Sequence, residues 1–225
     1  MKKITAEINC DAPNHTRVTI ENDGVSVTKK ILTTEFAEDL LVGNAREYYG
    51  PVMCSLPETL SMCRLHSTGR GGKFVLYVPA GKKNMLYSTE KKGKTQRVAF
   101  PPLLLYFDVQ NMRVCSSACF AVKEEHRSII NADTVLFNYP YGNVTPHSGS
   151  ICWGGNTFEQ LESFKTLDEY VGLFLTSQTN NDLFQGGRSV KCNNLAALIS
   201  QMAKAENFDL EILVPAGITV ASLLL

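Results

Sequence analysis

Strand-like and helix-like patterns occupy separate stretches of this chain, and their separation is the strongest constraint on its fold. Between residues 73 and 122 the apolar residues alternate or run together over short segments, as β-strands require. From residue 157 onward they recur at helical spacing. Segregated strands and helices predict an α+β fold rather than a βαβ fold. The expected strands cover residues 73–78, 84–88, 98–100, 103–107 and 113–122.

We expect these segments, of which residues 98–100 are only the beginning of a strand, to form an antiparallel meander of about four strands. Residues 103–107, Leu-Leu-Leu-Tyr-Phe, are almost continuously apolar, which is typical of a strand covered on both faces. Helices are expected after the meander, where Leu167, Val171 and Phe174, for example, share one helical face. The expected helices cover residues 157–164, 167–175 and 193–205.

The first thirty residues predict a small antiparallel β meander, with Asn22-Asp23-Gly24 as one of its turns. A helix is expected from Thr33 or Thr34 to Leu41. We therefore divide the chain into an N-terminal β elaboration, residues 1–32, and a main domain, residues 33–225. Residues 51–66 fit a helix or an extended chain equally well. The apolar end, residues 212–225, predicts a buried strand or a docked tail.

Charge and cysteine usage narrow the classes of function. Lysine plus arginine equals aspartate plus glutamate, 22 each, so broad capture of nucleic acid or of an anionic membrane is not expected. No apolar run approaches the roughly 18 residues that a membrane span needs. The N-terminus has no apolar signal-peptide core, and seven cysteines are too sparse for a disulfide scaffold. We expect a cytoplasmic protein with reduced thiols.

One irregular segment, residues 137–155, presents a cysteine in an unusual setting. Four glycines and two prolines within it force a specific, turn-rich path that contributes little to a core. Cys152 follows an isoleucine, precedes Trp153, and is followed by Gly154-Gly155. A thiol on such a loop can be exposed and reached by another protein, although a structural role is the common one for a cysteine between two large apolar residues.

The other cysteine chemistries have less support. Cys115 and Cys119 lie four apart in an expected strand, so we place them on the same side, where core packing explains them better than zinc binding. The nearest further ligand in sequence is His126, alone. A cysteine hydrolase needs a histidine to hold the thiolate. His147 is close in sequence but lies in a turn, and the papain-type signature is absent.

The segment resembles the active-site stretch of ubiquitin-conjugating enzymes, in which a His-Pro-Asn triplet and a turn precede Gly-x-Ile-Cys. The chain as a whole resembles prokaryotic ubiquitin-conjugating family D, also called the PRTRC system protein B group. The landmarks that carry this resemblance are Val78-Pro79-Ala80, Phe100-Pro101-Pro102-Leu103, Asp133-Thr134, Pro140, Asn143-Val144, Gly149-Ser150-Ile151-Cys152 and Trp153-Gly154.

The resemblance implies a ubiquitin-conjugating-enzyme-like fold: an antiparallel meander flanked by helices. It implies a carrier that accepts a ubiquitin-like protein from an activating enzyme as a thioester on Cys152 and passes it to an amine. Asn143 is then a candidate donor to the oxyanion, and His147 a candidate acceptor for the amine's proton. The implied partners are the ubiquitin-like modifier, a ThiF-like activating enzyme and a JAB-type peptidase from the same operon. No cofactor or metal is implied.

The chain also departs from the family pattern. The triplet is Tyr141-Gly142-Asn143, without the histidine, and one extra residue separates the asparagine from the cysteine. Trp153-Gly154-Gly155-Asn156 replaces the usual Leu-Asp after the cysteine. Two alternatives therefore stay open. One is an inactive module that binds a ubiquitin-like protein or its activating enzyme, and the other is a cysteine hydrolase. Asn143 has an alternative of its own, an Asx-type bond that only holds the turn.

Overall fold

The computed structural model describes residues 3–8, 15–22, 25–33, 55–66, 69–89 and 92–225. The chain divides into two compact units, Met1–Gly50 and Pro51–Leu225. The division that we predict from the sequence, after residue 32, remains a prediction. The two units are described separately below.

The first unit contains a three-stranded antiparallel sheet, which confirms the predicted meander. Lys3 of the first strand pairs with Glu21 of the second, and Asn22 of the second strand pairs with Val25 of the third. The predicted turn residues 23–24 and the predicted helix beyond Thr33 lie outside the described residues. The strands are β1 (Lys3–Ile8), β2 (His15–Asn22) and β3 (Val25–Leu32).

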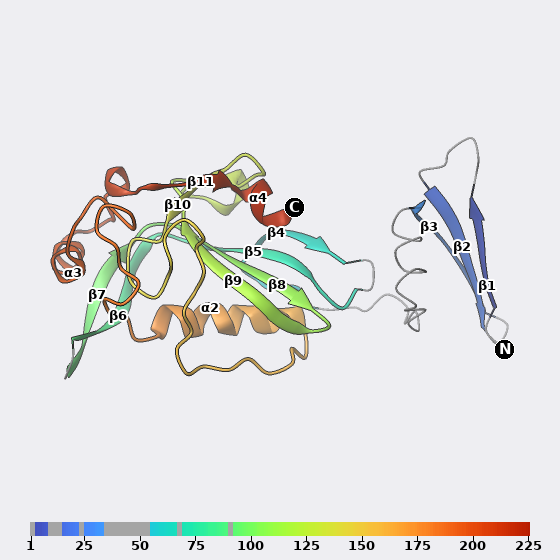
Figure 1. Cartoon of the computed structure of the whole chain (residues 1–225), viewed down its shortest axis with the longest axis horizontal. Coiled ribbons are helices and arrows are strands. Elements are labelled where there is room, and N and C mark those ends of the chain that lie inside the picture. Colours follow the sequence, from blue (N-terminus) through green and yellow to red (C-terminus); the bar gives the residue numbers. More distant parts are fainter. Residues whose placement is uncertain (1–2, 9–14, 23–24, 34–54, 67–68, 90–91) are drawn as a thin grey trace. The chain divides into compact units, whose positions relative to one another are not determined.

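The second unit is built on a six-stranded antiparallel sheet in the order β11-β10-β9-β8-β5-β4 (Figure 1). The sequence allowed either a helix or extended chain in residues 55–66. These residues contain β4, the first of the six strands in sequence, so this part of the chain is not a helix. Residues 51–54 lie outside the described part. The strands are β4 (Leu60–Leu65), β5 (Gly72–Val78), β8 (Leu103–Gln110), β9 (Arg113–Ala121), β10 (Val135–Asn138) and β11 (Pro215–Thr219).

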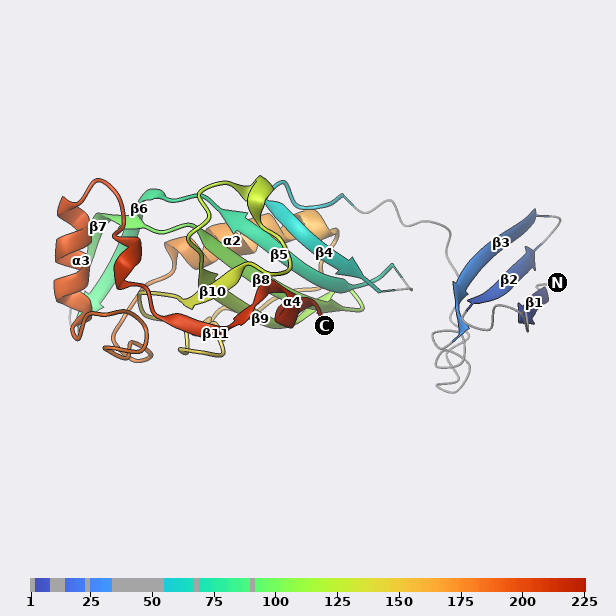
Figure 2. The ribbon, with the colours of Figure 1, turned by 90° about the horizontal axis from the view of Figure 1, so that it is seen from above.

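Two strands that we assigned to the central meander form a separate hairpin. β6 (Gly81–Thr89) and β7 (Lys92–Phe100) pair only with each other among the named strands, and β5 pairs directly with β8. The hairpin lies at one end of the sheet beside helix α3 (Leu195–Lys204), as both views show (Figures 1 and 2). Both strands have strand periodicity, but periodicity does not specify pairing partners, so the prediction of one continuous meander was wrong in this respect.

Two of the three predicted helices are confirmed, as α2 (Leu167–Thr176) and α3. At the start of α3 the Asn194 side chain accepts a hydrogen bond of 2.9 Å from the Ala197 N–H, as an N-cap residue does. The short remaining helices are α4 (Val220–Leu224) and the 3₁₀ turns η1 (Arg127–Ile129), η2 (Phe164–Thr166) and η3 (Leu210–Ile212). None of the described helices is long and apolar enough to cross a membrane.

The helix predicted for residues 157–164 was wrong. This stretch is irregular until the 3₁₀ turn begins at Phe164. Its apolar residues make separate contacts with different parts of the chain instead of forming one helical face. The Phe158 ring meets Trp153 edge to face with 4.7 Å between centroids, and the Leu161 N–H donates to the Met112 carbonyl at 2.7 Å. These long-range contacts outweigh a local helical preference, which is a weak one.

The central sheet is covered on both faces, as the apolar run in β8 predicts. Leu103, Leu105 and Phe107 belong to the core cluster that includes residues of α2. Leu104 and Tyr106 face the opposite cluster, which includes Val220 of α4. Figures 1 and 2 show α2 and α4 on opposite sides of the strands. The apolar C-terminal end therefore provides both a strand, β11, and a docked segment, α4.

Candidate functional site

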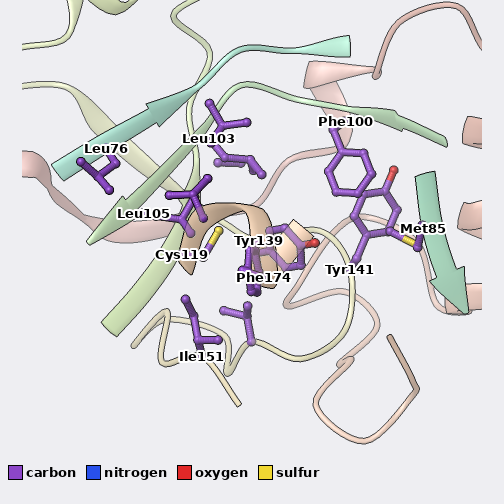
Figure 3. Packing of buried hydrophobic residues seen from close by; sticks show 14 of the residues in the cluster. Leu76, Met85, Phe100, Leu103, Leu105, Cys119, Tyr139, Tyr141, Ile151 and Phe174 are labelled. Carbon is purple, nitrogen blue, oxygen red and sulfur yellow. The ribbon is translucent and has the colours of Figure 1, made fainter. Parts of the chain in front are cut away.

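The candidate site lies where the chain leaves β10, and two buried tyrosines fix the start of this path. Tyr139 packs on Phe174 of α2 with 5.3 Å between ring centroids, and the Tyr141 hydroxyl donates to the Ala99 carbonyl of β7. Figure 3 shows both rings among the core side chains. Burial raises the pKa of both phenols well above their ordinary value, so both stay protonated and act as structural anchors.

After the tyrosines the chain folds back on itself in a narrow hairpin, residues 143–152. The Cys152 N–H donates to the Asn143 carbonyl at 2.8 Å, and the Thr145 N–H donates to the Ser150 carbonyl at 2.9 Å. The return path needs left-handed backbone at Asn143, His147 and Gly149, with φ values of +68°, +66° and +66°. Asparagine and glycine are among the residues that adopt this conformation most readily.

The packing around Gly149 also leaves no space for a side chain. A Cβ at this position would lie 2.6 Å from Cε2 of the Phe120 ring, which is fully buried in β9. The Gly149 carbonyl also accepts a hydrogen bond of 2.8 Å from the Cys119 N–H. The turn is therefore pressed directly against the sheet. A side chain at residue 149 would lift it away.

The returning arm of the hairpin runs antiparallel to β9. Ala118 pairs with Ser150, and the Ile151 N–H donates to the Ser117 carbonyl at 3.3 Å. Ile151 is buried in the core cluster that contains Cys119 (Figure 3). Because side chains alternate along an extended segment, Ser150 and Cys152 face the other side. Cys152 is exposed, as a nucleophile that meets another protein must be.

Trp153 anchors the chain immediately after Cys152. Its indole Nε1–H donates to Ser117 Oγ at 2.8 Å, and its ring lies edge to face with Phe158 and with Phe174. The following turn is closed by an Asn156 N–H bond of 3.1 Å to the Trp153 carbonyl. Our sequence analysis treated Trp153 only as part of a motif and missed this role. A large aromatic residue between the thiol and two glycines is the signal that could have found it.

Asn143 lies beside Cys152 because the two residues are joined by the first backbone bond of the hairpin. Its side-chain Nδ2 donates to the Gln178 carbonyl at 2.7 Å. This bond reaches the segment after α2, so it is not the local Asx-type bond that we considered for this residue. An amide carries two hydrogens on Nδ2, so one of them remains for another acceptor.

His147 lies at the tip of the hairpin, beyond the two backbone bonds that separate it from Cys152. Its side chain is exposed and makes no hydrogen bond within the described residues. Its backbone N–H donates to Asn138 Oδ1 at 2.6 Å, and buried Asn138 also donates to the Arg188 carbonyl. The described structure therefore brings Asn143 to Cys152 but leaves His147 at the far end of the turn.

The other cysteines separate into different environments. The pairing of β8 with β9 skips Cys115, because Asp108 pairs with Ser116 and Val109 with Val114. This β-bulge breaks the alternation, so the prediction that Cys115 and Cys119 share an environment was wrong. Cys119 is fully buried, which raises the pKa of its thiol well above the ordinary value, whereas Cys115 is exposed. The described residues contain no group of three or more side chains suited to hold a metal.

A shallow cavity of about 260 Å³ lies beside β9 and is lined by Ile151 and Trp153, the neighbours of Cys152 in sequence, but not by Cys152 itself. One wall is the segment of β9 at the bulge, and the other comes from the residues that flank the thiol. Its polar groups are serine hydroxyls and the Cys115 thiol, and its apolar groups are aromatic rings and Ile151. The lining residues are Val114, Cys115, Ser116, Ser117, Ser150, Ile151, Trp153 and Phe158.

The family model described as prokaryotic E2 family D matches residues 51–216. No curated protein and no solved structure matches the chain. The matched span contains the hairpin, Cys152 and the central sheet from β4 to the first two residues of β11. The family resemblance that we drew from the sequence is thereby confirmed.

Proposed function

Because this chain belongs to prokaryotic E2 family D, we propose that it is a carrier that holds a ubiquitin-like protein as a thioester on Cys152 and transfers it to an amine. Membership of an E2-like family indicates E2-like function, with a ubiquitin-like protein and an activating enzyme as general partners. The thioester itself and its attachment to Cys152 are the proposal.

The observation that carries the proposal is the way Cys152 is presented. The thiol is exposed, while the residues on either side of it are fixed: Ile151 is buried in the core and Trp153 is bonded to Ser117. A structural cysteine between two large apolar residues would be buried. An exposed thiol with fixed neighbours can attack the activated carbonyl carbon of a large partner, and an amine can later attack the thioester that forms.

The chemistry is two successive acyl transfers. The Cys152 thiolate attacks the carbonyl carbon of the activated modifier, and the bond from that carbon to the activating enzyme's sulfur breaks. In the second transfer an amine attacks the same carbon, a C–N bond forms, and Cys152 leaves as the thiolate. Each step passes through an oxyanion that hydrogen-bond donors stabilise.

Asn143 is the proposed side-chain donor to that oxyanion. It lies beside Cys152, and its second Nδ2 hydrogen is free of the Gln178 bond. The N–H groups of Gly154 and Gly155 are proposed as backbone donors, since both glycines are exposed directly after the site. His147 is the proton acceptor that the resemblance implies, and His147→Ala tests that role.

The finer identity follows from the same premise. We propose that the α+β sheet is a ubiquitin-conjugating-enzyme-like fold, and that the chain belongs to the PRTRC group within the family. A ThiF-like activating enzyme and a JAB-type peptidase are its proposed partners. Purification of the chain together with products of neighbouring genes would test these partners.

The test is a loading assay with the cognate modifier, its activating enzyme and ATP. We expect a thiol-sensitive adduct on the chain that is absent in Cys152→Ala. In Cys152→Ser the adduct becomes a stable oxygen ester. Cys115→Ala is the matched control, because Cys115 is also exposed, and it must load normally. An adduct that persists in Cys152→Ala would disprove the assignment.

A second candidate is a binding module without turnover. It is favoured by the engagement of Asn143 with Gln178 and by the absence of the family's histidine from the triplet. This candidate predicts tight binding of the modifier or activating enzyme that survives Cys152→Ala, with no covalent species under any condition. For the hydrolase alternative, the described residues place no imidazole in hydrogen-bond contact with the Cys152 thiol.

A further inference from the structure

A second cavity, of about 220 Å³, is lined by basic side chains and is separate from the Cys152 hairpin. Arg64 belongs to β4, His66 follows it, Lys73 belongs to β5, and Leu225 completes the lining. In the sheet order, β8 and β9 lie between these two strands and the hairpin, which pairs with β9. The proposed carrier function makes no use of this cavity, which we call the basic cavity.

The strand register brings two full positive charges together in the basic cavity. Arg64 pairs directly with Lys73, so the two side chains project from the same face of the sheet. Like charges directly opposite each other destabilise a sheet. Arg64 Nη1 also donates to the Leu224 carbonyl at 3.2 Å, which holds the guanidinium at the end of α4. The fold therefore keeps the two cations close together although their repulsion is unfavourable.

The described residues provide no counter-ion for this pair of cations. No carboxylate among them forms an ion pair with Arg64, His66 or Lys73. Asp108 is the partner of Lys73 on β8, but no ion pair joins these two side chains. The Leu224 carbonyl that Arg64 contacts is neutral. An anion from outside the chain would therefore find two cations that no ion pair neutralises.

The backbone beside the cavity is shaped to hold the imidazole of His66. The His66 N–H donates to the Gly71 carbonyl at 3.0 Å, which closes the connection between β4 and β5. A Cβ at Gly71 would lie 3.0 Å from His66 Nδ1, so the ring lies against the glycine backbone. A neutral imidazole carries one N–H donor. His66 therefore adds a hydrogen-bonding group to the two charged ones.

We propose that the basic cavity binds the phosphate group of a small, soluble phosphate monoester. Such a group carries a charge of about −1.5 to −2 at pH 7, which matches two fixed cations, whereas a carboxylate or chloride would balance only one. The Arg64 fork donates to the phosphate oxygens through its remaining N–H groups, and Lys73 acts as a point charge.

The size of the cavity and the charge of the chain limit the rest of the ligand. The cavity is smaller than the roughly 300–1,000 Å³ of sites for drug-sized ligands, so it accommodates a phosphate group with few further atoms. The chain has 22 basic and 22 acidic residues, so it has no general attraction for anionic membranes or nucleic acid. Both facts favour a small soluble ligand over a phosphorylated surface.

The test is titration calorimetry of the full chain with glycerol phosphate and with inorganic phosphate, in chloride buffer of matched ionic strength. We expect saturable binding that is weakened about 10-fold or more in Arg64→Gln and in Lys73→Gln, because each variant loses a charged hydrogen-bond donor. Arg97→Gln is the matched control. It removes an exposed arginine from β7, outside the cavity, and should bind as the wild type does. Cys152→Ala should also bind normally, so this result does not depend on the carrier function.

A second measurement separates binding from the general effect of phosphate on proteins. Phosphate stabilises folded chains by exclusion from their surface, so the urea midpoint rises in every variant. The rise should be larger in the wild type and Arg97→Gln than in Arg64→Gln. Equal rises in all three, or calorimetric binding that Arg64→Gln and Lys73→Gln leave unchanged, would overturn the proposal. Binding to vesicles that contain phosphatidic acid, without competition by glycerol phosphate, would also overturn it in favour of a membrane site.

Discussion

Gly149 occupies a position where two penalties for a larger residue add together. Its φ of +66° is left-handed, which costs an L-residue about 1–2 kcal/mol. An alanine Cβ would also press on the Phe120 ring, 2.6 Å from Cε2, and overpacking of a buried site costs about 1–3 kcal/mol. We therefore expect Gly149→Ala to lower the free energy of unfolding by about 2–5 kcal/mol.

The chain offers a matched control for this prediction. Gly154 has a similar φ of +60°, but nothing lies within 4 Å of the position its Cβ would take. Gly154→Ala should therefore lose only the backbone contribution, about 1–2 kcal/mol. The difference between the variants isolates the contact with Phe120. Urea unfolding followed by fluorescence gives both values, because the single tryptophan, Trp153, lies between the two positions.

Equal losses in the two variants would refute the argument that the hairpin is pressed against β9. A second check combines Gly149→Ala with Phe120→Leu, since a smaller side chain removes the overlap. The double variant should then lose less than the sum of the two single losses, by about 1 kcal/mol or more. Strict additivity would show that the two residues do not interact. Gly149→Ala should also slow loading of Cys152, because it displaces the arm that carries the thiol.

Three further predictions concern the surroundings of the thiol. Trp153→Phe removes the hydrogen bond to Ser117 and should cost about 0.5–1.5 kcal/mol in urea unfolding, whereas Ser117→Ala in that background should cost almost nothing more. Asn143→Ala should slow loading and discharge by roughly two orders of magnitude if its amide serves the oxyanion, and a wild-type rate would limit Asn143 to its bond with Gln178. Burial raises the pKa of the Cys119 thiol above its ordinary 9.0, so the thiol ionises in the unfolded chain at a lower pH than in the folded chain. The free energy of unfolding should therefore be unaffected by this group below pH 9 and should fall above it, by up to about 1.4 kcal/mol per pH unit. In Cys119→Ala the urea midpoint should fall less steeply over the same alkaline range.

Elements with strong local periodicity could be predicted from the sequence. The apolar run in β8 indicated a strand covered on both faces, and it is covered by α2 on one face and α4 on the other. The spacing of apolar residues in α2 and α3 located both helices within a few residues of their observed ends. In these segments local preference and tertiary packing agree, so the pattern is sufficient.

Prediction failed where long-range contacts decide the structure. Residues 157–164 have apolar residues at helical spacing, but Phe158 and Leu161 make their contacts with Trp153 and Met112 instead. The β6–β7 hairpin has strand character, yet its separation from the main sheet depends on which strand pairs with β5. The bulge at Cys115 is a property of the β8–β9 pairing and has no counterpart in the spacing of the cysteines.

The family, the α+β class and the candidacy of Cys152 follow from the amino-acid sequence alone, because turn residues, periodicity and motif spacing are local properties of the chain. The surroundings of the thiol, in contrast, depend on tertiary contacts. Asn143 lies beside Cys152 and bonds Gln178, His147 lies at the far tip, and Trp153 holds Ser117. The bonds from Asn143 to Gln178 and from Trp153 to Ser117 join residues more than thirty positions apart, so no single segment can form them alone.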